Sequence, residues 1–92
     1  MAERLRGAPE RERRRLLTRW MQDAVADLAG LAERPSPRAG LFDLGIDSLH
    51  ALNLKKRLEE VSGLELPDTL ALDWPSIEMI VNLVVVQTRQ DP

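Results

Sequence analysis

The chain has 92 residues, enough for one domain with a limited core, and carries a net charge of −2 with 43% hydrophobic and 30% charged residues. This balance is typical of a soluble globular domain and gives no electrostatic reason to expect nucleic acid as a partner. The absence of cysteine excludes disulfides and thiolate metal sites. No apolar run reaches the ~18 residues of a membrane span, and the charged N-terminus does not resemble a signal peptide. We therefore expect a cytoplasmic protein without membrane contacts.

The first helix is predicted over residues 9–31, after a lead-in at residues 1–8 that we interpret as a flexible linker. Pro9 suits the first position of a helix, and Gly30 suits its end. Apolar residues recur between them at helical spacing, namely Leu17, Met21, Ala24 and Leu28.

Residues 11–15 of this helix hold four arginines and one glutamate. They could form a basic docking patch, or they could be a solvated helix face with carboxylates nearby. The balanced net charge of the chain favours the solvated face.

A long loop is predicted at residues 32–46, because Pro35, Pro37 and Gly40 break a helix. Loops of this length without secondary structure are often functional. Its second half is apolar, and we expect it to be held on the core by Leu41, Phe42, Leu44 and Ile46.

The second helix is predicted at 48–62, ending before Gly63. One face should be buried, formed by Ala51, Leu54, Leu58 and Val61. The other face would carry Leu49, Leu52, Asn53, Lys56 and Glu60. We interpret it as a partner-binding face, although Leu52 could equally be peripheral core, and single exposed leucines such as Leu49 are common.

The remaining chain is predicted to form an extended connector, a short helical turn at 69–73, a last helix at 76–88 capped by Ser76, and a polar tail at 89–92. Residues 80–86 have the composition of a strand, but no partner strand exists to satisfy its backbone. We therefore predict an all-α fold of three main helices and one short helix, with a long first loop. Its core would comprise Leu17, Met21, Ala24, Leu28, Phe42, Leu54, Leu58, Ile77, Ile80 and Val84.

The junction between the loop and the second helix has the chemistry of a phosphate-ester site. Asp47 is a strong helix N-cap, so Ser48 should stand at the first helical position. Outward backbone N–H groups and the helix dipole favour negative charge there.

Residues 44–49 read Leu-Gly-Ile-Asp-Ser-Leu, which resembles the L-G-x-D-S-L motif of acyl carrier proteins. Leu-Phe-Asp before the motif, with Leu-Glu-Leu-Pro and Asp-Trp-Pro-Ser after the helix, resembles carrier domains of modular type I polyketide synthases. The resemblance covers residues 9–87 and marks 9–88 as the carrier domain.

This resemblance implies that 4′-phosphopantetheine from coenzyme A is esterified to Ser48, with Asp47 as the cap that orients it. The arm would hold acyl or polyketide intermediates as thioesters. The implied partners are a phosphopantetheinyl transferase and the ketosynthase, acyltransferase and other domains of a synthase. These partners would bind a face formed by Leu49, Leu52, Asn53 and Lys56. The isolated domain would be monomeric.

Other carriers and a non-carrier remain open at this point. A fatty-acid or peptidyl carrier is possible, although Ile46 replaces the second glycine of the L-G-G-[HD]-S motif typical of peptidyl carriers. Asn53 and the basic residues 55–57 stand where many carriers are acidic, which favours a tethered domain whose partners are held at high effective concentration. A helical interaction module, in which Ser48 merely caps, is the alternative from another class.

Catalysis by Ser48 is disfavoured. His50 is the only histidine, and side chains at i and i+2 of a helix do not face each other. The G-x-S-x-G nucleophile motif is absent, and one histidine without cysteine is a poor metal-ligand set. We predict a domain that catalyses nothing itself and binds no metal.

Overall fold

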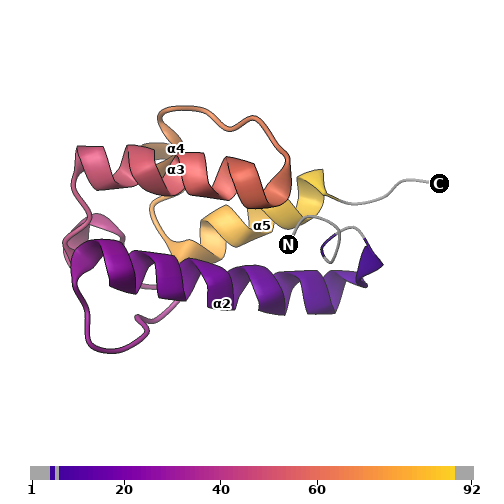
Figure 1. Ribbon diagram of the computed structural model, residues 1–92, viewed down its shortest axis with the longest axis horizontal. Coiled ribbons are helices and arrows are strands. Elements are labelled where there is room, and N and C mark those ends of the chain that lie inside the picture. The colour runs from indigo at the N-terminus through magenta and orange to yellow at the C-terminus, as the bar shows by residue number, and fades with distance from the viewer. Residues whose placement is uncertain (1–4, 6, 89–92) are drawn as a thin grey trace.

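The computed structural model describes Leu5 and residues 7–88, and these are mainly helical. Its elements are α2 (Glu10–Ala29), the 3-10 turn η1 (Phe42–Leu44), α3 (Ser48–Ser62), α4 (Leu70–Asp73) and α5 (Ile77–Gln87) (Figure 1). Within the described residues the only strand-like pairing is one isolated bridge between Gly40 and Ser76. The predicted all-α fold is confirmed, and residues 80–86 are helical despite their strand-like composition.

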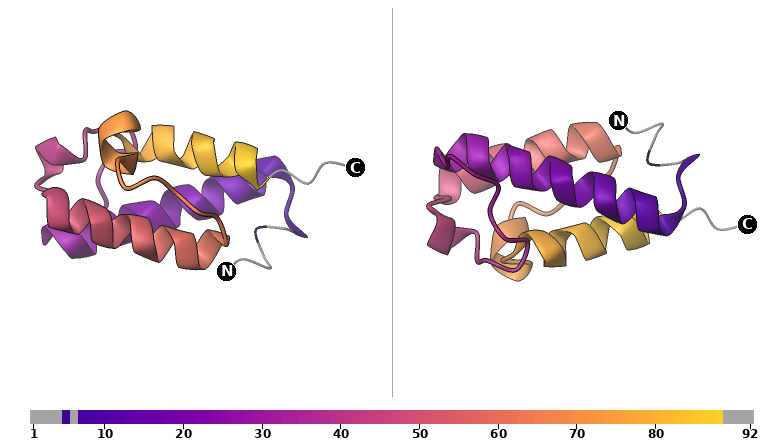
Figure 2. Two further views of the ribbon diagram at one scale, coloured as in Figure 1. Left: turned by 90° about the horizontal axis from the view of Figure 1, so that it is seen from above. Right: turned by 90° about the horizontal axis from the view of Figure 1, so that it is seen from below.

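The three long helices form a bundle along the long axis of the molecule. α2 packs against both α5 and α3, and α4 packs against α3. Figure 1 shows that α2 and α3 run in opposite directions, and both views of Figure 2 place α5 beside α2. None of the helices in the described part of the chain combines the length and the apolar character needed to cross a membrane.

Eight of the ten residues predicted for the core are buried, and Leu28 is half-buried. The prediction for Phe42 is wrong, because its side chain is 43% exposed. In a 3-10 turn, residues three apart share a face. Leu41 and Leu44 therefore face inward around η1, while Phe42 between them faces outward.

The start of α2 differs slightly from the prediction. Pro9 is the N-cap residue rather than the first helical residue, with an extended ψ of 159°. Its carbonyl oxygen accepts the N–H of Arg13 at 2.9 Å. At the other end α2 stops at Ala29, two residues short of the predicted 31, and Gly30 closes the helix with a positive φ of 69°, as expected of a stop signal.

Packing extends upstream of Pro9. Leu5 is only 1% exposed and belongs to the core, and Arg13 Nη1 donates to the carbonyl of Ala8 at 3.0 Å. Leu5 is thus an anchored part of the predicted lead-in. Residues 1–4 and 6 of that lead-in, and the predicted tail at 89–92, lie outside the described residues.

The long first loop is fastened to two helices. Its Pro35 carbonyl accepts from Gln22 Nε2 in α2 at 2.9 Å, and its Pro37 carbonyl accepts from the N–H of Glu78 in α5 at 2.8 Å. Further on, the N–H of Leu41 donates to the carbonyl of Pro75 at 2.8 Å. These bonds fix the path of the loop and therefore the point at which α3 begins.

Candidate functional site

A tight turn delivers the chain into α3. Gly45 follows η1 with a φ of 101°, a conformation that an L side chain would strain, and its N–H donates to the Phe42 carbonyl at 3.2 Å. Ile46 comes next, and its N–H donates to the carbonyl of Leu41 at 3.2 Å. Its side chain is 2% exposed. The two residues before the cap are therefore held by backbone geometry and by burial.

Asp47 is the N-cap of α3, as the sequence predicts. Its backbone is extended, and its Oδ1 accepts the N–H of His50 at 2.7 Å. Its carbonyl oxygen accepts the N–H of Ala51 at 2.8 Å. The carboxylate also places negative charge at the positive end of the helix dipole. A cap of this kind stabilises a helix by about 1 kcal/mol.

Ser48 is the first residue of α3, and its side chain is exposed. Its hydroxyl forms no hydrogen bond within the described part of the chain, because Asp47 has taken the capping position. At a helix N-terminus the first N–H groups have no intrahelical acceptor and favour anions. An enzyme can thus reach this hydroxyl, and the site fits a phosphodiester.

His50 interacts with Asp47. Its Nδ1 lies 3.4 Å from Asp47 Oδ1, and this nitrogen is buried without a hydrogen-bond partner. A contact of this kind gives an ion pair only when the imidazole is protonated. No hydrogen bond joins His50 to Ser48 in the described residues, and these residues also contain no cluster of metal-binding side chains.

The residues predicted for the partner face lie along the exposed side of α3. Leu49 is 73% exposed, Asn53 and Lys56 are exposed, and Leu52 is half-buried. Sequence reasoning missed Phe42, the exposed aromatic residue of the segment that leads to Ser48. The spacing of Leu41 and Leu44 at i and i+3 was the signal that could have placed Phe42 on the outside.

A sequence model of one protein family, described as "Phosphopantetheine attachment site", matches residues 19–84. The chain belongs to this family. Its members carry 4′-phosphopantetheine by covalent attachment, so this is a carrier domain and supplies no catalysis of its own. The free hydroxyl at the start of α3 suits that cofactor.

Solved carrier structures are similar over almost their whole length. The A1-type acyl carrier domain from module 5 of MLSA1 is 31% identical, with a TM-score of 0.81 over 94% of this chain and 88% of that one. BlmI, a type II acyl carrier protein from Streptomyces verticillus involved in bleomycin biosynthesis, is 28% identical with a TM-score of 0.79. That match covers 87% of this chain and 95% of BlmI. The carrier bundle is thereby confirmed.

The similar sequences are segments of much larger proteins. The polyketide synthase GfsB of Streptomyces halstedii is 39% identical over 77 residues, which is 82% of this chain and 1% of that protein. The erythronolide synthase of Saccharopolyspora erythraea is 37% identical over 78 residues, or 83% of this chain and 2% of that protein. The chain thus spans only 1–2% of the length of these synthases and is similar to one segment of each.

Proposed function

We propose that this carrier domain holds acyl or polyketide intermediates as thioesters in polyketide assembly, on a 4′-phosphopantetheine arm attached to Ser48. One observation carries the assignment of the residue. The Ser48 hydroxyl is exposed and unbonded within the described residues, directly after a carboxylate that has taken the cap. The identity of 39% to a polyketide synthase segment supports the choice of cargo.

Attachment requires one displacement at phosphorus. Ser48 Oγ attacks the pantetheine-bearing phosphate of coenzyme A, the new O–P bond forms, and the bond to the leaving 3′,5′-bisphosphoadenosine breaks. The hydroxyl proton passes to a base of the transferase, because the one histidine of this chain faces Asp47. When attached, the arm supplies a thiol that this cysteine-free chain lacks.

The surroundings of Ser48 have separate tasks in this proposal. Asp47 keeps the serine at the first helical position, and Gly45 and Ile46 hold the approach to it. Leu49, Leu52, Asn53 and Lys56 present the face that a phosphopantetheinyl transferase, a ketosynthase and an acyltransferase would contact. Phe42, exposed just before the motif, is added to that face.

The proposal also covers the domain boundaries and context. The carrier would comprise residues 9–88, with 1–8 as linker and 89–92 as tail, and the burial of Leu5 supports a linker that is anchored near its end. We propose that the carrier is a monomeric part of a multidomain cytoplasmic synthase. Peptidyl cargo is less favoured because Ile46 replaces the second glycine of the peptidyl motif.

Mass spectrometry of the intact protein tests the cofactor. The apo protein, incubated with coenzyme A and a broad-specificity phosphopantetheinyl transferase, should gain the mass of one phosphopantetheine. Coenzyme A without the transferase is the control and should add nothing. A wild-type protein that stays unmodified would leave the helical interaction module as the better account.

A further inference from the structure

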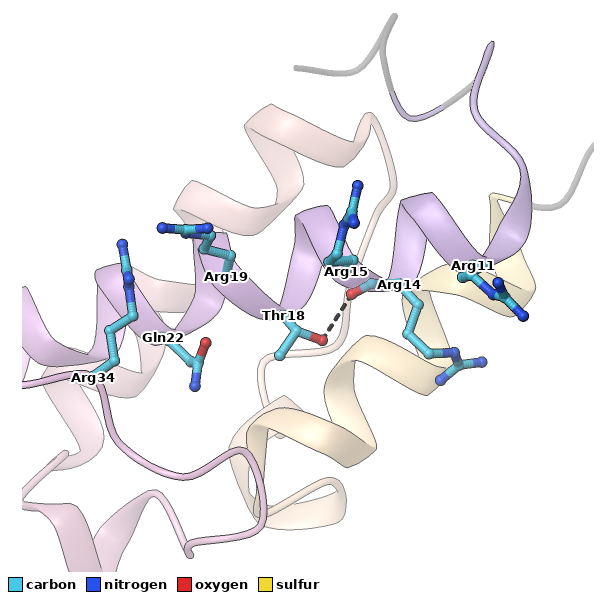
Figure 3. A pocket seen from close by; sticks show the side chains of 7 residues that line it. All are labelled: Arg11, Arg14, Arg15, Thr18, Arg19, Gln22 and Arg34. Atoms are coloured by element: carbon cyan, nitrogen blue, oxygen red, sulfur yellow. Dashed lines mark hydrogen bonds between the residues drawn. The ribbon is translucent and has the colours of Figure 1, made fainter.

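Beside the first half of α2 lies an open hollow of about 470 Å³ that is lined by polar side chains (Figure 3). Five of them are arginines, four from α2 and one from the loop that follows it. The complete lining is Arg11, Arg14, Arg15, Thr18, Arg19, Gln22 and Arg34, and we call it the arginine hollow. No residue of this lining belongs to the approach to Ser48 or to the exposed face of α3.

The arginine hollow concentrates the positive charge of an acidic chain. It takes five of the 13 basic residues, so the rest of the chain has eight basic residues against 15 acidic ones. A carrier with a net charge of −2 therefore has one strongly positive face, which attracts anionic groups and repels cationic ones.

Arg11, Arg15 and Arg19 form no ion pair within 4 Å among the described residues, although Arg19 is close enough to Asp23 to help lower the pKa of that carboxyl. They are spaced by four and so stand in one row, where neighbouring like charges destabilise a helix. The other two are engaged, since Arg34 Nε is 2.6 Å from Asp23 Oδ1 and Arg14 donates to Asn82 Oδ1.

Three of the other basic residues form ion pairs. Arg38 pairs with Glu78, Arg57 pairs with Asp27, and Lys55 lies between two carboxylates. Arg13 and Lys56 form no ion pair among the described residues either, but neither belongs to a row of like charges spaced by four. The row in α2 disfavours the interpretation of this segment as a solvated face neutralised by its own carboxylates.

We propose that the arginine hollow is a docking surface for an acidic segment of a partner protein. Each guanidinium presents a planar fork of donors that matches a carboxylate with two parallel hydrogen bonds. The lining contains no large apolar side chain that could insert into a membrane. A long polyanion such as DNA would also meet the acidic remainder of the surface, whereas a short acidic segment would not.

The Arg11 and Arg15 end of the arginine hollow is separate from the attachment site. α2 and α3 are antiparallel, so Ser48 at the start of α3 lies toward the end of α2, away from Arg11 and Arg15 (Figure 1). A partner bound in the hollow would leave the Ser48 face free for a second enzyme. The carrier would then be held by one surface while its arm is used at another.

NMR titration of the ¹⁵N-labelled protein tests this proposal, with a blocked hexaglutamate peptide as the probe at low salt. The largest shifts should fall on residues 11–19 and Arg34, and they should shrink at 0.5 M salt because exposed ion pairs are screened. Shifts centred on Lys55, Lys56 and Arg57 instead would overturn the proposal, because those residues form the other basic cluster.

Two double variants that lose the same amount of charge distinguish binding at the arginine hollow from general attraction by net charge. Arg15→Gln with Arg19→Gln should weaken peptide binding about fivefold, as expected for two lost exposed charge pairs. Arg38→Gln with Arg57→Gln is the matched control and should leave the affinity within twofold of wild type. If both double variants bind the peptide equally weakly, the loss of affinity is due to net charge alone. That result would contradict a specific binding surface.

Two competing ligands test the class of partner. The unlabelled peptide should displace the bound peptide at a lower anion concentration than either a short DNA duplex or vesicles of phosphatidylglycerol. More effective displacement by the duplex or by the vesicles would overturn the choice of a protein segment. Peptide binding is measured without Ser48. A failure of this experiment would therefore not count against the attachment of phosphopantetheine to Ser48. Arg15→Gln with Arg19→Gln should also be phosphopantetheinylated at the wild-type rate, which confirms that it is folded.

Discussion

The carboxylate of Asp47 accepts the backbone N–H of His50 at 2.7 Å and so occupies the cap position that Ser48 could otherwise have taken. Two neighbouring residues that are both good caps are thereby given different tasks. Asp47 stabilises the start of α3, and the Ser48 hydroxyl is left without a hydrogen bond in the described residues.

Replacement of Asp47 by alanine should lower the free energy of unfolding by about 1 kcal/mol, because the cap is lost. Modification of Ser48 should also become slower, since the serine would then compete for the cap. Asp47→Asn, which can still cap, is the control and should be close to wild type in stability. Urea denaturation measures the effect, and an Asp47→Ala variant as stable as wild type would show that the cap contributes nothing.

Leu58 of α3 is fully buried, so Leu58→Ala should cost about 2–5 kcal/mol of stability. Leu72→Ala is a matched control, because Leu72 is 69% exposed in α4 and should tolerate the same change with little effect. The two variants should therefore differ clearly in urea midpoint. Equal midpoints would mean that the buried face of α3 is assigned wrongly.

Leu49→Glu should fold normally but be modified more slowly, because Leu49 is 73% exposed and adjoins Ser48. Val86→Glu is the control, since Val86 is 57% exposed on α5 and lies outside the proposed face. Circular dichroism checks the fold, and timed mass spectra give the modification rate. If Leu49→Glu unfolds, Leu49 has a structural role and the argument for the partner face fails.

A small ionic network between α3 and the connector to α4 predicts acid sensitivity. A hydrogen bond from Lys55 at 2.9 Å lowers the pKa of Asp68 below 3.8. The backbone N–H of Leu66, with Lys55 as a further donor, lowers the pKa of Glu59 below 4.5. Both carboxyl groups bind protons more weakly in the folded state. Their stabilising effect is therefore complete above these unfolded values and is lost as the pH falls through the folded ones.

Lys55→Met should accordingly lower the urea midpoint at pH 7, where both carboxylates are ionised. The difference from wild type should shrink as the pH falls below about 4, because protonation removes the same interaction from the wild-type protein. Lys56→Met is the comparison and should change the midpoint less, since Lys56 forms no ion pair among the described residues and lowers the pKa of Asp68 only by a weaker Coulombic interaction. A difference between Lys55→Met and wild type that stays constant from pH 7 to pH 2 would contradict the linkage.

Local signals explain which parts of the fold were predictable. The bounds of α3 match the predicted residues 48–62, because Asp47 and Gly63 are strong start and stop signals. The helix at α5 was also predictable, since a lone strand could not have satisfied its backbone. In contrast, hydrophobicity alone assigns Phe42 to the core, whereas the i, i+3 spacing of Leu41 and Leu44 around η1 places it outside.

Tertiary packing determines the burial and the ion pairing that the sequence pattern does not predict. Val25 and Val85 are buried although they lie beside the predicted stripes, because α2 and α5 pack over a broader face than one stripe. The pair of Lys55 and Asp68 depends on the path of the connector after Gly63, which no sequence signal specifies. At the site, the cap and the serine follow from local chemistry alone, whereas the exposure of Phe42 depends on the turn before them.

The central claim, attachment at Ser48, is tested most directly by comparing two serine variants. Ser48→Ala and Ser36→Ala each remove one exposed hydroxyl, and Ser36 lies in the first loop, where its Oγ accepts the N–H of Arg38. With coenzyme A and a broad-specificity transferase, Ser36→Ala should gain the mass of one phosphopantetheine, and Ser48→Ala should gain none while keeping its helicity. Full modification of a folded Ser48→Ala protein would contradict the account and move the attachment to another hydroxyl.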